Sequence, residues 1–340
     1  MPITRSYTSA FEIVDYSKEL ELIPLAPTLL NDSGLFQEEM LSTHTVTFEE
    51  MSQSIGLLGD VYRGSKPQAN NDDNRKIRTY PLVHFAVTDS ILPQDIQGKS
   101  AYGAIGTAET EAAVMARKME RIVKSFGQTL EAARFKTLTT GNIFAPNGTV
   151  TGNFFSDFGV TQTSVNFALG TSTTDVVAKV EEVIATVQDN ANTGDVITGM
   201  IGYCSPEFFA AFISHPKIQS AYQYFSATEG QMIQRNRAGG GTGLYREFTY
   251  AGLRLVEVRQ SIGGERLIPA NEAVFVPLGT DSFSTFYGPC SKLDFTNTIA
   301  QRTYMFTYRD PKGEKIEIDA SSDFINVLKR PKLVIKGIKA

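Results

Sequence analysis

The longest regular pattern of apolar residues in this chain has the period of an α-helix and covers residues 107–136. Its apolar side chains recur at spacings of three and four, which places them on one stripe of a helix. The stripe consists of Met115, Met119, Ile122, Phe126, Leu130 and Ala133. Gly141 follows as a stop signal. At a rise of 1.5 Å per residue, such a helix would be about 45 Å long, more than one compact domain needs. We therefore expect a strut with other elements arranged along it.

Two stretches before this helix alternate with a period of two, which is typical of half-buried strands. They cover residues 42–48 and 78–88, and Pro81 favours an edge position for the second. The polar stretch 64–74 between them has almost nothing to bury. The pattern predicts a long two-stranded excursion with a polar tip.

An isolated excursion of this kind is marginally stable, because two strands bury little and every ordered residue loses entropy. It is either a floppy loop or an arm that is ordered by lying on a neighbouring copy. Cations flank its tip although the chain is acidic, so an acidic surface on another subunit is a suitable partner. The candidate contact residues are Arg63, Lys66, Arg75, Lys76 and Arg78.

The outer face of the long helix carries three cations, Arg117, Arg121 and Lys124, at spacings of three and four. Like charges at these spacings repel slightly unless carboxylates stand nearby. Glu120 and Lys124 form a favourable pair. The face is either solvated or a contact surface for a neighbour or a scaffold protein.

Residues 1–42 are irregular and predict an arm that lies on other elements, with a short helix from Asn31 or Asp32 to Met40. Residues 137–170 predict short strands and turns.

The second half of the chain predicts a compact α+β module. Thr174 or Asp175 can cap a helix, residues 197–204 form a buried strand, and Ser205 caps a further helix whose first residue is proline. A glycine-rich loop over 226–243 holds Arg235 and Arg237, two more candidate contact residues. Strands are expected at 248–250, 253–258 and 273–277, and antiparallel β-structure from residue 294 onward, including 323–328 and 333–338.

Composition excludes several classes of protein. The 340 residues carry a formal net charge of −5, so no field of lysine and arginine is available to grip DNA. Two cysteines are too few for a disulfide framework. The N-terminus lacks the pattern of a signal peptide, and the densest apolar run, 208–213, is too short to span a bilayer. We expect neither a protein secreted by that route nor a membrane protein.

Signatures of catalysis and cofactor binding are missing. The histidines, His44, His84 and His215, lie in unrelated contexts and none has a partner at metal-binding spacing. The glycines of 239–243 are not followed by the residues of a phosphate-binding loop. We expect no cofactor, no metal and no enzyme. A hydrolase or ligand-binding protein that uses the 146–285 module is the alternative from another class.

The predicted order of elements resembles that of the major capsid proteins of tailed bacteriophages, whose fold is named after phage Hong Kong 97. More narrowly, the chain resembles the lambda-type capsid protein E family. The similarity is clearest at residues 267–276, 286–288, 308–311 and 321–328.

This resemblance implies an α+β fold of the Hong Kong 97 type and a division of the chain. An N-terminal arm would cover 1–42, an E-loop 43–92, a peripheral domain with a spine helix 93–145, an axial domain 146–285 and peripheral β-strands 286–340. The loop at 223–243 would point to the capsomer axis.

The resemblance also implies a function. The chain would assemble with itself as pentamers and hexamers into an icosahedral shell around double-stranded DNA, in the host cytoplasm. A separate scaffolding protein and a portal would be partners, a decoration protein is allowed, and packaged DNA would be contacted weakly. An encapsulin-like shell that stores an enzyme is the alternative within the same fold.

Overall fold

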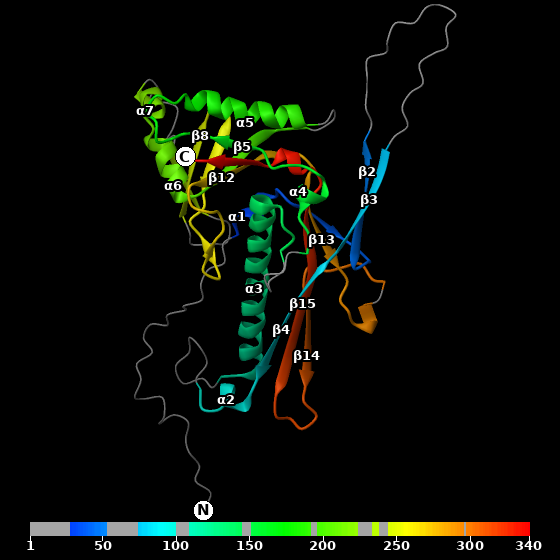
Figure 1. Ribbon diagram of the computed structural model, residues 1–340. Coiled ribbons are helices and arrows are strands. Elements are labelled where there is room, and N and C mark those ends of the chain that lie inside the picture. Colours follow the sequence, from blue (N-terminus) through cyan, green and yellow to red (C-terminus); the bar gives the residue numbers. More distant parts are fainter. Residues whose placement is uncertain are drawn as a thin grey trace, which may run out of the picture.

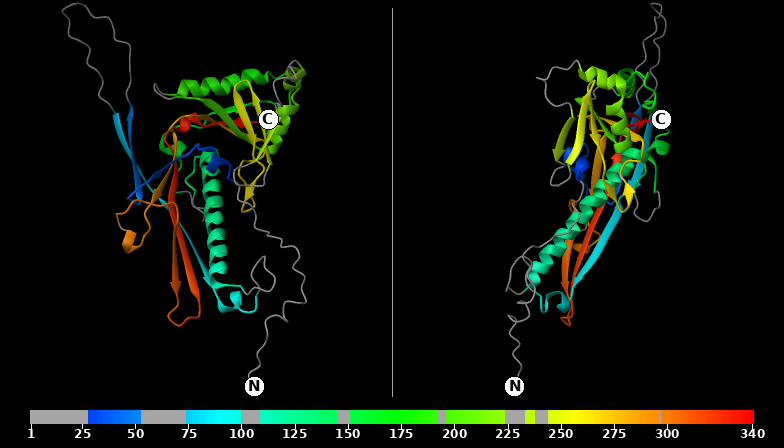
Figure 2. Two further views of the ribbon diagram at one scale, coloured as in Figure 1. Left: turned by 180° about the vertical axis from the view of Figure 1, so that it is seen from behind. Right: turned by 90° about the vertical axis from the view of Figure 1, so that its left-hand side faces the viewer.

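The computed structural model describes residues 28–52, 74–99, 109–144, 151–191, 196–223, 233–237, 244–295 and 297–340. Figure 1 shows a mixed α+β molecule in which one long helix runs beside a long, narrow sheet, with a second sheet and its helices at one end. The left view of Figure 2 shows the same arrangement from behind, with the long helix beside the narrow sheet. The fold class expected from the sequence is confirmed.

The long helix is α3, Glu111–Thr140. It begins four residues later than predicted because the Thr110 hydroxyl accepts the N–H of Ala113 and caps it. It continues to Thr140, where Gly141 ends it with a φ of 71°. The predicted stripe faces the interior, since Ile122 and Ala133 are buried and the other four positions pack against buried clusters.

A five-stranded sheet lies along α3. It has the order β1-β13-β15-β14, and β4 pairs with β15 on the other side. The strands are β1 Gln37–Met40, β4 Val83–Ile91, β13 Phe283–Gly288, β14 Tyr304–Arg309 and β15 Ile316–Leu328. The strand expected over 323–328 is the second half of a continuous strand of 13 residues, which pairs with β13, β14 and β4 and holds the sheet together.

Strands β2 (Thr45–Ser52) and β3 (Asn74–Pro81) form an antiparallel hairpin, paired from Thr45 with Pro81 to Ser52 with Asn74. The extended run predicted over 78–88 is divided at Leu82, whose N–H bonds to the His44 carbonyl at 3.0 Å. Beyond this point the chain joins the five-stranded sheet as β4. The two-stranded excursion is therefore shorter at its root than expected, because β15 offers a better partner to the second half of the run.

The second sheet has seven strands in the order β5-β16-β12-β6-β9-β8-β7. They are β5 Ser164–Asn166, β6 Gly199–Cys204, β7 Ile233–Arg237, β8 Leu244–Tyr250, β9 Leu253–Glu257, β12 Glu272–Leu278 and β16 Ile335–Ile338. Helices α5 (Val176–Asn190), α6 (Pro206–Ser214) and α7 (Pro216–Gln223) pack against it over a core rich in phenylalanine. Asp175 and Ser205 cap α5 and α6 as predicted.

Short elements connect these parts. The helical ones are α2 Pro93–Ile96, α4 Phe154–Asp157, and the 3-10 turns Leu293–Phe295 and Pro331–Leu333. Strands β10 (Ser261–Ile262) and β11 (Glu265–Arg266) form a small antiparallel hairpin.

Two local predictions were wrong, and the pairing of the last strand was not foreseen. The short helix in the arm is α1, Leu29–Ser33, and Gln37–Met40 is instead strand β1, because it pairs in parallel with β13. Part of the predicted loop 226–243 forms β7, which pairs with β8. The last strand, β16, pairs with β12 and β5 in the seven-stranded sheet, not with the other strands of 286–340.

Candidate assembly surfaces

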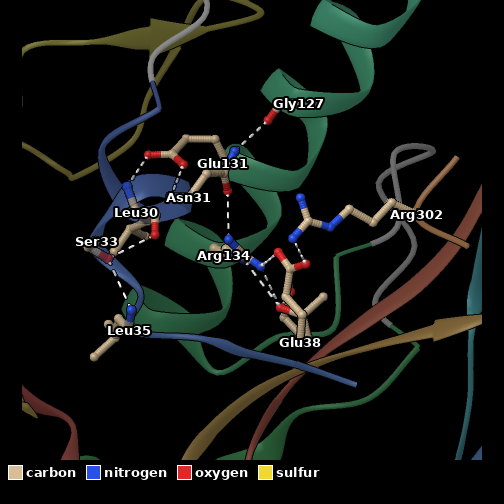
Figure 3. Close-up of polar contacts among 11 residues, drawn as sticks. Leu30, Asn31, Ser33, Leu35, Glu38, Gly127, Glu131, Arg134 and Arg302 are labelled. Atoms are coloured by element: carbon tan, nitrogen blue, oxygen red, sulfur yellow. Dashed lines mark hydrogen bonds and ion pairs between the residues drawn. The ribbon is translucent and has the colours of Figure 1, made fainter. Parts of the chain in front are cut away.

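The N-terminal arm is tied to α3 by a buried carboxylate, shown in Figure 3. Glu131, whose side chain is fully buried, accepts the backbone N–H of Leu30 at 2.7 Å and that of Asn31 at 2.9 Å. The Asn31 side chain donates to the Gly127 carbonyl at 3.1 Å. Since Leu29 and Leu30 are buried as well, the described part of the arm lies on the body of the molecule, as predicted.

The same junction contains Arg134, which is 1% exposed. Its guanidinium donates to Asn31 Oδ1 at 2.9 Å, to Glu38 Oε1 at 3.0 Å and to the Thr285 hydroxyl at 3.0 Å. Glu38 also pairs with the exposed Arg302 at 2.6 Å. One side chain of α3 therefore joins α1, β1 and β13 (Figure 3).

Burial raises the pKa of Glu131 to about 7, although the two backbone N–H groups and the Arg134 charge lower it. The desolvation of the anion outweighs its hydrogen bonds. This carboxyl group changes its charge near neutral pH at the point where the arm is attached.

The three cations on the outer face of α3 have carboxylate partners within the same chain. Arg117 pairs with Glu109 at 3.2 Å and Arg121 with Asp89 at 2.9 Å. Lys124 pairs with Glu120 at 2.9 Å, as predicted. The sequence analysis identified neither Glu109 nor Asp89 as a partner of these cations. Asp89 could not be identified from spacing, because it lies on β4, which only the tertiary fold brings next to α3.

Asp89 is a meeting point of these charges. Burial by itself would raise the pKa of Asp89, but hydrogen bonds from Lys118 and the Ser90 N–H, with the charges of Lys118 and Arg121, outweigh it and lower the pKa. Lys118 lies 3.1 Å from Asp89 and also donates to the Ser90 carbonyl. These bonds fasten α3 to β4.

The hairpin β2–β3 has one packed and one open face. Phe48 packs on Phe286 and Tyr80 on Phe154, with ring centroids 5.4 and 5.3 Å apart. Arg78 lies over the Phe158 ring at 4.4 Å. On the opposite face Ile77 is 71% exposed beside the hydrogen-bonded pair of Thr47 and Thr79. The root of the hairpin is anchored by apolar contacts, while its open face presents a β-branched surface.

The other candidate contact residues are placed only in part. Arg63 and Lys66 lie outside the described residues. The backbones of Arg75, Arg235 and Arg237 are in β3 and β7. Lys76 and Arg78 follow Arg75 on β3, and Lys76 is exposed. The structure thus groups the described hairpin cations on one strand, away from the cations of α3.

Sequence reasoning missed a cluster at the root of the hairpin. His44 and His84 both contact the buried carboxylate of Asp323, which belongs to β15. The residues are far apart in the sequence, so their spacing offers no signal; only the pairing of β4 with β15 brings them together.

Cys204 and His215, two chemically reactive side chains away from this cluster, are buried. Among the described residues no group of three or more His, Cys, Asp or Glu is arranged to hold a metal ion. Burial raises the pKa of the Cys204 thiol, and the His215 ring bonds to the Thr171 carbonyl at 3.0 Å. Residues 239–243 lie outside the described part. Over the described ranges, no helix has the length and apolar character needed to cross a bilayer.

Solved structures with the same arrangement of elements are phage capsids. The capsid of the Myoviridae phage XM1 matches with a TM-score of 0.59 at 7% identity, covering 96% of each chain. The capsid of cyanophage Pam1 matches with a TM-score of 0.57 at 12% identity, covering 99% of each chain. The long helix, hairpin and two sheets thus form a Hong Kong 97 type capsid fold.

Sequence comparison defines the class more narrowly. The chain belongs to the family described as phage major capsid protein E, which matches residues 15–339. It is 42% identical to the major capsid protein of Pseudomonas phage KPP10, over 98% of each chain. The major capsid protein of Salmonella phage Felix O1 is 27% identical over 98% of this chain and 97% of the relative. The resemblance to capsid proteins is confirmed, and with it the interpretation as a structural protein of a phage capsid.

Proposed function

We propose that this chain assembles with copies of itself, as pentamers and hexamers, into the icosahedral shell that encloses a phage genome of double-stranded DNA. The observation that carries the proposal is the 42% identity to a major capsid protein over nearly the full length of both chains. The capsid fold of the described residues supports it.

Each part of the chain has a proposed role in the lattice. The hairpin would be the E-loop that reaches a neighbouring subunit, and α3 the spine helix of a peripheral domain. The seven-stranded sheet with α5, α6 and α7 would form the axial domain around the capsomer axis. Because β16 belongs to that sheet, the end of the chain would be part of the axial domain.

The hairpin supports a role that requires a neighbour. Within the described residues its sheet has only two strands, and Ile77 on its open face is 71% exposed. Covering such a face against another copy removes apolar surface from water and offsets the entropy of ordering the loop. The exposed Lys76 would meet an acidic group on a neighbouring copy, whereas Arg78 already lies over Phe158 within the subunit.

The proposed partners follow from the same role. A separate scaffolding protein and a portal would act during assembly in the host cytoplasm, and a decoration protein could add to the finished shell. The net charge of −5 suits a lining that contacts packaged DNA weakly. The chain would have no catalytic activity of its own.

The experiment that tests the proposal is sedimentation velocity together with negative-stain electron microscopy on the recombinant protein. It is run on the protein alone and on the protein co-expressed with a candidate scaffolding protein. Shells, tubes or rings of capsomer size are expected. A monodisperse monomer under every condition, including high concentration and crowding agents, would overturn the proposal.

A further inference from the structure

The two legs of the hairpin are attached to one buried carboxylate. His44 comes directly before β2, and His84 is the second residue of β4, just past the end of β3. The Nδ1 atom of His44 lies 3.7 Å from Asp323 Oδ2, and that of His84 is hydrogen-bonded to Asp323 Oδ1. The Asp323 side chain is only 6% exposed, whereas both imidazoles are more than half exposed. Protons therefore reach the rings from solvent while the carboxylate stays buried.

The cluster lies where the two strands of the hairpin meet the five-stranded sheet. The Leu82 N–H bonds to the His44 carbonyl, so the two legs are joined at the same level. Asp323 lies on β15 in register with His84 of β4 on one side and with Gly288 of β13 on the other. The carboxylate is thus a fixed point in the middle of the sheet, and the hairpin is the part that can be held or released.

Imidazole side chains in general can change their charge near neutral pH. A protonated ring adds its positive charge to the hydrogen bond with a carboxylate that water screens poorly, whereas a neutral ring can donate its N–H without that attraction. The shallow pocket of about 230 Å³ beside His84 also contains Lys292 from the β13–β14 connection, Asp319 from β15 and Cys290. Among these types of side chain, imidazole is the one whose ordinary titration range lies between about pH 5.5 and 7.5.

We infer that His44, His84 and Asp323 form a proton-dependent clamp that fixes the root of the hairpin in acid and releases it at higher pH. The clamp is a property of the single subunit. Its consequence, that pH regulates how firmly the hairpin is presented to a neighbouring copy, rests on the proposed function.

The test is hydrogen–deuterium exchange of peptides from β2 and β3 in unassembled subunits. It is measured at about pH 5.5 and 7.5, with rates corrected for chemical exchange. Wild-type protection should be about tenfold higher in acid, the size expected for hydrogen bonds to a charged group. H44Q/H84Q and D323N should remove this difference. The matched control D319N alters a carboxylate on the same strand that bonds to Thr88, and should keep it.

An unchanged pH ratio in H44Q/H84Q would overturn the clamp. Both histidines are exposed, so this variant tests the clamp even if near-ultraviolet circular dichroism shows that D323N does not fold. E131Q should retain the ratio, because Glu131 belongs to the arm junction. Light scattering then follows assembly separately. If the hairpin shows the expected pH-dependent protection but the subunits never assemble, the proposed function is contradicted and the clamp is not. If assembly does not depend on pH, the link between the clamp and assembly is contradicted.

Discussion

At the scale of single residues, the side chains that join the arm to α3 are the least visible in the sequence. Glu131 and Arg134 are charged residues on a helix, and a solvated position is the ordinary expectation for them. In the structure both are buried, and each contacts the arm. Their importance follows from desolvation, because a buried charge without its partners is costly.

The raised pKa of Glu131 predicts how stability changes with pH. The folded chain holds the proton up to about pH 7, whereas an unfolded glutamate releases it near its ordinary value of 4.5. The folded state therefore binds more protons between these values, and stability falls as the pH rises through this window, by roughly 3 kcal/mol. Because glutamine carries no charge at any pH, E131Q should gain stability relative to wild type from pH 5 to pH 8.

Urea unfolding at both pH values measures this difference. E120Q, on the exposed face of the same helix, is the matched control and should show no such change. A wild type that gains on E131Q as the pH rises would mean that the hydrogen bonds and Arg134 outweigh burial.

Arg134 and Arg302 offer a matched comparison, because both pair with Glu38 but only Arg134 is buried. R134M should cost about 2 to 3 kcal/mol, since it leaves polar groups of the arm and of Thr285 without a charged donor. R302M should cost less than about 1 kcal/mol, because its pair is exposed to solvent. Equal losses in urea unfolding would contradict the role of Arg134 as the central contact of the junction.

At the scale of elements, the ends of α3 show which sequence signals are decisive. The apolar stripe identified the helix, but Thr110 and Gly141 determine where it begins and ends. Threonine hydroxyls near the end bond back to carbonyls of the preceding turn, as Thr139 does to Phe135. The helix continues beyond the stripe as far as Thr140, where Gly141 ends it.

Gly141 and Gly127 predict opposite effects of the same substitution. At Gly141 the φ of 71° and the overlap of an added Cβ with the Phe155 ring make alanine unfavourable, so G141A should cost at least about 2 kcal/mol. Gly127 lies inside the helix with open space around it, so G127A should stabilise by about 0.5 to 1 kcal/mol. Thermal unfolding of both variants checks the signs; stabilisation by G141A would contradict the left-handed stop.

The ion pairs seen in the structure modify the prediction for substitutions of the cations on α3. From the sequence, replacing all three with glutamate is expected to affect assembly more than subunit stability. The internal ion pairs add a cost within the subunit, largest at Arg117, because the Glu109 side chain is only 4% exposed. R117E should therefore lower the melting temperature of the isolated subunit more than K124E, whose partner Glu120 is 63% exposed.

If a neighbouring copy contacts this face of α3, the R117E and K124E variants should assemble less well than their loss of subunit stability alone explains. The yield of shells is compared at a temperature where both variants remain folded. Normal assembly of K124E would contradict a contact between Lys124 and a neighbouring copy.

At the scale of the whole molecule, the hairpin is the part that the isolated chain supports least. Its root packs on Phe286 and Phe154, but its open face faces solvent. Deletion of residues 66–74, which include the start of β3, should leave a soluble, folded subunit that assembles poorly. The reason is that the main core clusters draw on β2 and β3 only near the root.

Circular dichroism measures whether the shortened subunit is folded, and sedimentation velocity measures whether it assembles. A second deletion variant with a short glycine linker across the gap controls for strain in the shortened loop. Normal shells from either deletion would reject the role of the hairpin in assembly.

The sequence by itself determined the elements whose signals are local. The period of α3 and the caps of α5 and α6 at Asp175 and Ser205 depend on neighbouring residues, so they could be predicted. The order of these predicted elements carried the resemblance to capsid proteins, and that resemblance implied the Hong Kong 97 type of fold, which periodicity does not encode.

The tertiary structure alone decided what depends on distant partners. Strand β1 exists because β13 pairs with it, the run 78–88 divides because β15 receives its second half, and β16 crosses to the seven-stranded sheet. The partners of Glu131, Asp89 and Asp323 lie dozens to hundreds of residues away along the chain. Hydrogen bonds and ion pairs act over a few ångströms in space, so sequence spacing cannot reveal them until the fold has brought the strands together.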